Sequence, residues 1–142
     1  MKKTLNNLFV VLLLAFPLLP EVFADGQFFV LNQENKQVLT FKQLRKIYLG
    51  KITIWESGLP IRPCLYKTES ATRKFYADII RKTEEKYNMY WNRQLFSGSG
   101  AKPLEFTDRD SLQNHLRRNK GAICVVDGLS QSLKDQYRLL SF

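Results

Sequence analysis

The sequence contains only one histidine, His115, and this scarcity removes most histidine-based chemistry from consideration. No serine or cysteine nucleophile lies around it at a recognisable spacing, so neither a Ser-His-Asp nor a Cys-His catalytic set is indicated. His115 stands beside the inward-facing Leu116 of an expected helix, a position typical of surface or boundary packing. No pair of carboxylates stands out either. We therefore expect no catalytic residues and a protein that is not an enzyme.

Signatures of bound cofactors are also missing. The chain has no cluster of metal ligands at a known spacing, no Walker loop and no dinucleotide fingerprint, so neither a metal nor another cofactor is predicted. The two cysteines, Cys64 and Cys124, lie 60 positions apart, which excludes a local Cys-x-x-Cys motif. Each lies in an apolar stretch typical of a strand. They fit a disulfide and a pair of buried thiols equally well, because sequence does not fix the geometry of a bridge.

Long hydrophobic runs are absent except near the N-terminus. There, the run from Leu5 to Leu19 follows the positive pair Lys2-Lys3 and ends at Pro20-Glu21. Val22-Phe23-Ala24 then offers suitable residues for cleavage after Ala24. This arrangement is typical of a secretory signal peptide, so we assign residues 1–24 to one. A membrane anchor is disfavoured, because a spanning helix needs about 20 apolar residues.

The mature chain, residues 25–142, would be a single domain of 118 residues with a net charge of +8. No later segment is apolar enough to span a bilayer, so no stable membrane insertion is expected after cleavage, and the predicted location is periplasmic or secreted. The positive charge attracts anions such as phosphate, acidic glycans and anionic lipid. Export excludes nucleic acid as the expected partner. Much of the charge also fits an ordinary solvated surface.

Hydrophobic periodicity and turn residues predict alternating strands and helices. Strands are expected at Gln27–Leu31, Ile61–Tyr66, Ala122–Val126 and Tyr137–Phe142, and helices at about 41–48, 68–82, 84–96 and 108–120. Thr40 and Thr83 are the expected N-caps of two of these helices. The order predicts an α/β fold, with a mainly parallel sheet covered by helices.

Four segments occur in a familiar order: LRKIYLGKITIW (44–55), IRPCLYKTESATRKFY (61–76), YWNRQLFSGSGAKP (90–103) and GAICVVD (121–127). They resemble the phosphate-binding periplasmic proteins of ABC transporters, and more closely the small single-domain substrate-binding-like members of that superfamily. The resemblance covers nearly the whole mature chain, and LGKI-x-x-W and GAI-x-x-V are fairly specific together. It implies the fold of one lobe of a type II periplasmic-binding protein.

The resemblance also raises a mechanical difficulty. Full-length relatives close two lobes on a ligand, whereas this chain has room for only one lobe. A single lobe buries a ligand by closure only if a second chain supplies the other wall. A homodimer or a protein partner is therefore part of the expectation.

In phosphate-binding relatives, the turn after the second of these segments carries an arginine and a Ser-Gly-Thr run. The matching turn here supplies tentative ligand-binding residues: Lys67, Thr68, Ser70, Thr72 and Arg73. Ser70 and Thr72 occupy the matching hydroxyl positions, and Lys67 or Arg73 adds positive charge. A strand-to-helix turn also directs backbone N–H groups and the helix dipole toward an anion.

The same turn departs from the family pattern. Ala71 replaces the glycine, and no arginine precedes the run. Glu69 places a carboxylate where the helix dipole would otherwise attract an anion. The residues therefore also fit a structural helix start, with Thr68, Glu69 and Ser70 as capping residues.

A glycine-rich loop is the second candidate for a binding site. Gly98, Ser99 and Gly100 allow the backbone to approach a ligand closely, and Lys102 stands nearby. A flexible loop between two helices explains the same composition.

Two functions follow from this sequence. The first is an exported solute-binding-like domain for phosphate or a similar small oxyanion. The second is a ligand-free envelope interaction or scaffold protein derived from the same fold. In the second case, Tyr87, Tyr90 and Trp91 are candidates for a contact face, although packing in the core explains these aromatic residues as well.

Overall fold

The computed structural model describes residues 28–128 and 131–141. The expected signal peptide, residues 1–24, lies outside the described residues, so its cleavage stays a prediction. Within the described ranges, no helix combines the length and the apolar character that crossing a membrane requires.

Strands and helices alternate along the chain as the sequence predicts, with two additional elements. The strands are β1 (Phe28–Asn32), β2 (Arg62–Tyr66), β3 (Leu104–Phe106), β4 (Ala122–Val126) and β5 (Tyr137–Ser141). The helices are α1 (Phe41–Tyr48), α2 (Glu69–Lys74), the π-helical η1 (Phe75–Ile80), α3 (Glu84–Phe96), α4 (Arg109–Arg118) and α5 (Gln131–Gln136). The two elements that the sequence did not predict are β3 and α5.

The strands form one mixed sheet in the order β3-β2-β4-β1-β5. β2 runs parallel to both of its neighbours, with Cys64 paired to Leu104 of β3 and to Cys124 of β4. β1 runs antiparallel to β4 and β5, with Val30 opposite Cys124 and Leu139. The three parallel strands therefore form one half of the sheet, and their carboxyl ends lie at the same edge.

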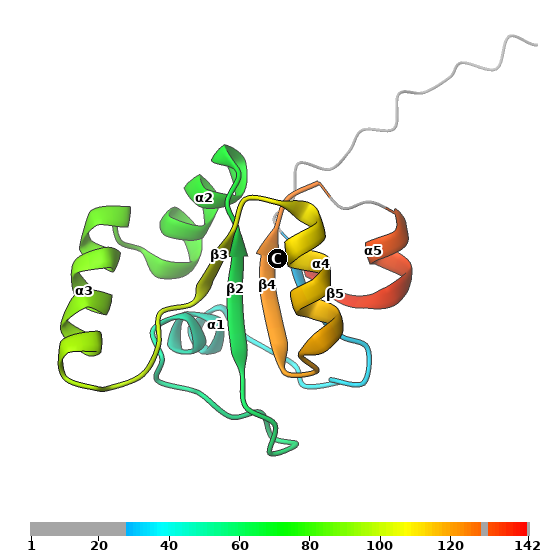
Figure 1. The fold of residues 1–142 in the computed structure, drawn as a ribbon, viewed down its shortest axis with the longest axis horizontal. Helices are drawn as coiled ribbons and strands as arrows, with labels where there is room; N and C mark the ends of the chain where they lie inside the picture. The colour runs from blue at the N-terminus through cyan, green and yellow to red at the C-terminus, as the bar shows by residue number, and fades with distance from the viewer. Residues whose placement is uncertain (1–27, 129–130, 142) are drawn as a thin grey trace, which may run out of the picture.

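Helices cover both faces of this sheet (Figure 1). α1, η1 and α3 pack on one face, against Leu65 of β2 and Ile123 and Val125 of β4. α4 packs on the other face, against Cys64 and Cys124. β4 is buried along its whole length, which confirms the interpretation of its continuous apolar sequence as a strand covered on both faces.

Short polar side chains start the helices at the predicted positions. Thr40 accepts a hydrogen bond from the backbone N–H of Gln43, whose side chain accepts one from the Thr40 N–H in return, completing a capping box. Thr83 and Asp108 accept in the same way from the N–H three positions further on. Each such cap contributes on the order of 1 kcal/mol. The starts of these helices are therefore fixed by local sequence.

The helix predicted at 68–82 is present but changes its winding. α2 continues directly into η1, which ends at Arg81 in the left-handed conformation, with a φ of 55°. The predicted apolar stripe is buried: Phe75, Tyr76, Ile79 and Ile80. Segments of π-helix are rare and occur frequently at functional sites.

The loop between α1 and β2 is held against the start of β4 by Trp55. Its indole Nε1 donates to the Gly121 carbonyl at 3.0 Å. A Cβ atom on Gly121 would lie 2.0 Å from the Pro60 carbonyl oxygen, so the two loops approach each other backbone to backbone. Gly121 is therefore required by this contact.

Candidate functional site

The predicted binding turn lies where β2 ends. β2 leads into α2 and η1 on one face of the sheet, and the neighbouring β3 leads into α4 on the other face. Open α/β sheets bind ligands where adjacent strands diverge in this way, outside the carboxyl ends of the strands. Lys67 and Thr68 follow β2, and Asp127 follows β4 at the same edge.

Thr68 joins the two strand ends. Its Oγ1 accepts a hydrogen bond from the backbone N–H of Ala71 at 3.2 Å, as the N-cap of α2. The same hydroxyl donates to the carboxylate of Asp127. Thr68 therefore acts as the cap that the sequence predicts and also fixes the start of α2 to the end of β4.

The charge of Lys67 is balanced within the protein. Its ammonium group lies 2.9 Å from Glu84 Oε1 and 3.3 Å from Glu105 Oε2. The hydrogen bond to Glu84 raises the pKa of Lys67, although partial burial opposes this, and Glu105 adds to the increase. Glu105 also accepts from Lys102 at 2.7 Å. Lys67 is thus part of an ion-pair network rather than a free cation.

The ion pair of Arg73 is more exposed than those of Lys67. Its guanidinium lies 2.7 Å from Glu69 Oε1, one helical turn earlier, and these side chains are 73% and 89% exposed. Exposed ion pairs contribute little to stability. Arg73 can therefore turn from Glu69 to another acceptor at small cost.

Two buried hydroxyl groups near this turn have no hydrogen-bond partner in the described structure: Thr72 Oγ1 and the Tyr76 hydroxyl. Tyr76 is only 7% exposed. Burial, with the nearby carboxylates of Glu84 and Glu105, raises the pKa of Tyr76 to about 12. The Tyr76 hydroxyl therefore stays protonated and can donate a hydrogen bond.

These residues line one pocket of about 390 Å³ at the start of α2, which we call the first pocket. Its lining is Lys67, Thr68, Glu69, Thr72, Arg73, Tyr76 and Glu84. Four of the tentative ligand-binding residues are thus brought together, while Ser70 does not line the pocket. Tyr76 and Glu84 complete it, and no turn motif in the sequence identifies them.

The glycine-rich loop lies elsewhere. Ser99 and Gly100 line a groove of about 660 Å³ together with Arg62, at the start of β2, and Leu104, at the start of β3. The first pocket lies at the opposite end of β2. The structure therefore does not bring the two candidate sites together, because the sequence order of the segments does not reveal which end of the sheet each loop occupies.

Three further cations lie beside the first pocket, and sequence reasoning did not select them. Arg81, Lys82 and Lys86 line an adjoining basin, which also includes Arg73 and Tyr76. Their signal in the sequence is a run of basic residues where one helix ends and the next begins.

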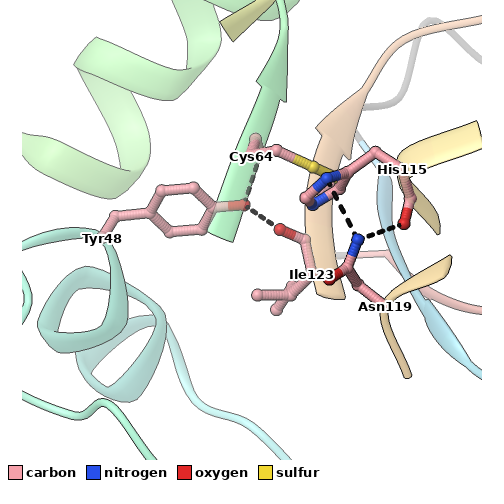
Figure 2. The surroundings of a disulfide bond; sticks show 6 residues. Tyr48, Cys64, His115, Asn119 and Ile123 are labelled. Atoms are coloured by element: carbon pink, nitrogen blue, oxygen red, sulfur yellow. Dashed lines mark hydrogen bonds between the residues drawn. A yellow bond between two sulfur atoms is a disulfide. The ribbon is translucent and has the colours of Figure 1, made fainter. Parts of the chain in front are cut away.

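Cys64 and Cys124 form a disulfide in the structure, between adjacent parallel strands (Figure 2). Their Cα atoms are 4.5 Å apart, within the range that a disulfide allows. On the α4 side, His115 lies beside the bridge, and Asn119 Nδ2 contacts its Nδ1 at 3.3 Å. On the opposite side, the Tyr48 hydroxyl donates to the carbonyl oxygens of Cys64 and Ile123. The bridge thus lies in the centre of the fold.

His115 and the two cysteines bring potential metal-ligand atoms within 4.8 Å of one another. Cysteine binds a metal as a thiolate, whereas these two sulfurs are bonded to each other. His115 is half-buried, its Nε2 has no hydrogen-bond partner in the described structure, and burial lowers its pKa. As it stands, this cluster is a packed disulfide with a neutral imidazole against it.

The aromatic residues of α3 belong mainly to the core. Tyr87 and Trp91 are 2% and 1% exposed, and Tyr90 is half-buried with its hydroxyl donating to the Leu49 carbonyl at 2.6 Å. Tyr87 and Trp91 therefore do not form an exposed contact face.

Comparison with known proteins finds proteins of similar structure, but no matching family model and no matching curated protein. No protein-family model matches the chain, and a search of curated proteins finds no match. The crystal structure of an ABC-type phosphate transport receptor from Vibrio cholerae matches with a TM-score of 0.53 and 19% identity, over 82% of this chain and 45% of that chain. A putative phosphate ABC transporter substrate-binding protein with bound phosphate from Clostridium perfringens matches with a TM-score of 0.49 and 21% identity, over 72% of this chain and 40% of that one.

The chain thus spans less than half the length of these two proteins. At this level of identity, the likeness to the Vibrio cholerae receptor shows the fold alone. The chain is an α/β domain with the fold of a single substrate-binding-protein-like lobe, which confirms the predicted fold class.

Proposed function

We propose that this protein is an exported solute-binding lobe that takes a small oxyanion, such as phosphate, in the first pocket. The observation that carries the proposal is the Tyr76 hydroxyl. It is buried, has no hydrogen-bond partner among the described residues, and belongs to a residue that lines this pocket together with Thr72. A buried polar group that lacks a hydrogen bond costs roughly 1–3 kcal/mol. Two such hydroxyls in one pocket support a ligand with acceptor oxygens at this place.

The chemistry of the pocket suits oxyanion oxygens. The Tyr76 and Thr72 hydroxyls are donors, and the exposed Arg73 guanidinium can leave Glu69 for a bidentate contact. Lys67 contributes positive potential, although Glu84 and Glu105 already balance its charge. Affinity then rests on directed hydrogen bonds more than on net charge.

The position of the pocket on the sheet, the N-terminal sequence and the similar solved structures support the same function. The first pocket lies at the carboxyl edge of parallel strands, where ligands of open α/β sheets bind. The N-terminal sequence favours export after removal of residues 1–24. The two similar solved structures are named for phosphate transport and bear on this chain only as support for the proposal.

Thermal unfolding of the purified protein tests the proposal. Phosphate at about 100 times its dissociation constant should stabilise the fold by roughly 2.7 kcal/mol, a shift on the order of 10 °C for a domain of this size. Sodium chloride at matched ionic strength should give no such shift.

Variants of the first pocket test where phosphate binds. Tyr76→Phe and Thr72→Val should each reduce the shift caused by phosphate, whereas Tyr137→Phe on β5 should leave that shift unchanged. An equal shift with chloride would overturn phosphate binding, and a full shift in Tyr76→Phe would overturn the site.

A ligand-free interaction protein remains the second candidate, and one observation favours it. Carboxylates already occupy the cations of the first pocket, with Glu84 on Lys67 and Glu69 on Arg73. The contact face would then be the groove near Ser99, where Ile54 and Leu104 are 60% and 51% exposed.

Light scattering after size-exclusion chromatography tests this second candidate. If two lobes associate through that groove, Ile54→Asp should convert a dimer to a monomer. A strictly monomeric wild-type protein would exclude self-association through this face.

A further inference from the structure

The basin beside the first pocket gathers four cations, of which only Arg73 forms an ion pair in the described structure. It is open, has a volume of about 760 Å³, and includes Arg81, Lys82 and Lys86 together with Arg73 and Tyr76. No carboxylate lines it, in contrast to the first pocket. Among the described residues, no ion pair involves Arg81, Lys82 or Lys86. We call this surface the basic basin.

The backbone of the basic basin is unusual in two ways. η1 is a π-helical segment that carries Tyr76, and it ends at Arg81. Arg81 has a φ of 55° and is the one non-glycine residue with a positive φ in the described chain. Glycine is the residue that adopts this conformation at a helix end most readily. Replacement of Arg81 by glycine is therefore compatible with the backbone at this position.

The two pockets are continuous, because Arg73 and Tyr76 line both of them. Together they place several cations around the same cavity as the buried Tyr76 hydroxyl. The basic basin, at about 760 Å³, therefore has room for a ligand with more atoms than one tetrahedral ion. An open basin also needs no second lobe to close over it, provided that several charges hold the ligand.

We propose that the basic basin binds a short chain of phosphoryl groups, with one terminal group at the Tyr76 hydroxyl and the others across Arg81, Lys82 and Lys86. The proposal rests on the proposed function, since both use Tyr76. It specifies the ligand class further, as an oligophosphate rather than a single small oxyanion.

Calorimetric titration with sodium tripolyphosphate and with orthophosphate, at matched ionic strength, tests this proposal. Tripolyphosphate should bind the wild-type protein about tenfold more tightly or better, because it adds charge-assisted hydrogen bonds. The triple variant Arg81→Gly, Lys82→Gln and Lys86→Gln should lose that advantage and keep its affinity for orthophosphate within about twofold. Glycine suits the backbone at position 81, so the variant is expected to fold.

A second triple variant removes the same charge from exposed positions outside the basin: Lys42→Gln, Lys51→Gln and Arg118→Gln. It should keep the preference for tripolyphosphate. Equal losses in both triple variants would overturn the proposal, because the preference would then reflect overall charge. Tripolyphosphate binding no tighter than orthophosphate would also overturn it while leaving the proposed function intact.

Two further measurements test the role of Tyr76 and the source of the phosphate groups: tripolyphosphate binding by Tyr76→Phe, and binding of the wild-type protein to anionic vesicles. Tight tripolyphosphate binding that Tyr76→Phe leaves unchanged would overturn the placement of a terminal phosphoryl group at Tyr76, and with it this proposal, while the proposed function would still be decided by the orthophosphate experiment. Vesicles containing phosphatidylglycerol present phosphate groups on a membrane surface. Binding to these vesicles without binding to tripolyphosphate would identify a lipid-binding surface and overturn the oligophosphate proposal.

Discussion

The Thr68 hydroxyl, just after β2, donates a hydrogen bond to the carboxylate of Asp127, just after β4. The same oxygen accepts the N–H of Ala71 and so caps α2. One side chain therefore holds together two strand ends and the first turn of the helix that carries Thr72. The geometry of the first pocket depends on this link.

Thr68→Ala removes both bonds of this hydroxyl. We expect a loss of about 1–2 kcal/mol in the free energy of unfolding, because the helix cap is lost and Asp127 loses a donor. Thr68→Ser keeps the oxygen and should lose much less. Urea unfolding monitored by circular dichroism measures both variants. Equal losses in the two would show that the methyl group of Thr68, and not its hydroxyl, is what matters.

Gly121→Ala tests the close approach of two loops. The new Cβ would meet the Pro60 carbonyl oxygen at 2.0 Å, so backbone must move, and we expect a loss of about 3 kcal/mol or more. Gly58→Ala is the matched control, since Gly58 has a φ of 85° but no atom within 4 Å of the added Cβ. It should lose about 1 kcal/mol from backbone conformation alone. Similar losses at both positions would refute the packing argument.

Local features of the fold could be predicted from the sequence, whereas long-range ones could not. Caps such as Thr40 and Thr83 depend on residues three positions away, and the structure confirms them. The antiparallel direction of β1 depends on pairing with strands near the other end of the chain. β3 has only three residues, Leu104–Phe106, which is too short for alternation of apolar and polar residues to identify a strand.

In the candidate site, too, local features could be predicted from the sequence, whereas contacts between distant residues could not. The turn after β2 was predicted from its resemblance to the turn of phosphate-binding proteins and from its hydroxyl and basic residues. The structure groups Lys67, Thr72 and Arg73 around one pocket. The partners of Lys67 are 17 and 38 positions away, so no local motif reveals that its charge is balanced.

The disulfide between Cys64 and Cys124 should contribute on the order of 2–4 kcal/mol, since it closes a long loop in the unfolded chain. The double variant Cys64→Ala and Cys124→Ala should unfold at lower urea concentration than the oxidised wild type. Alkylation under denaturing conditions should label neither cysteine before reduction and both after it. Labelling without reduction would show that the thiols are free.

The ion pairs around Lys67 and Glu105 should make stability depend on pH at both extremes. Partial burial acts to raise the pKa of Glu105, but Lys102 and Lys67 outweigh it, and the pKa is lowered from 4.5. A carboxyl group with a lowered pKa in the folded state stabilises the fold above its unfolded pKa, and this stabilisation is lost as the pH falls through the folded value. Lys67 has a raised pKa, so its contribution is lost only as the pH rises above 10.5.

Glu105→Gln should therefore be less stable than the wild type at pH 7, and the difference should shrink as the pH falls below 4.5. Urea unfolding at pH 7 and at about pH 3 measures this difference, because most carboxyl groups are protonated at the lower value. Glu56→Gln is the control, since Glu56 is exposed and no ion pair within the described residues involves it. Its stability should follow that of the wild type at both pH values. A constant deficit for Glu105→Gln would mean that the side chain stabilises the fold by packing, without a contribution from its charge.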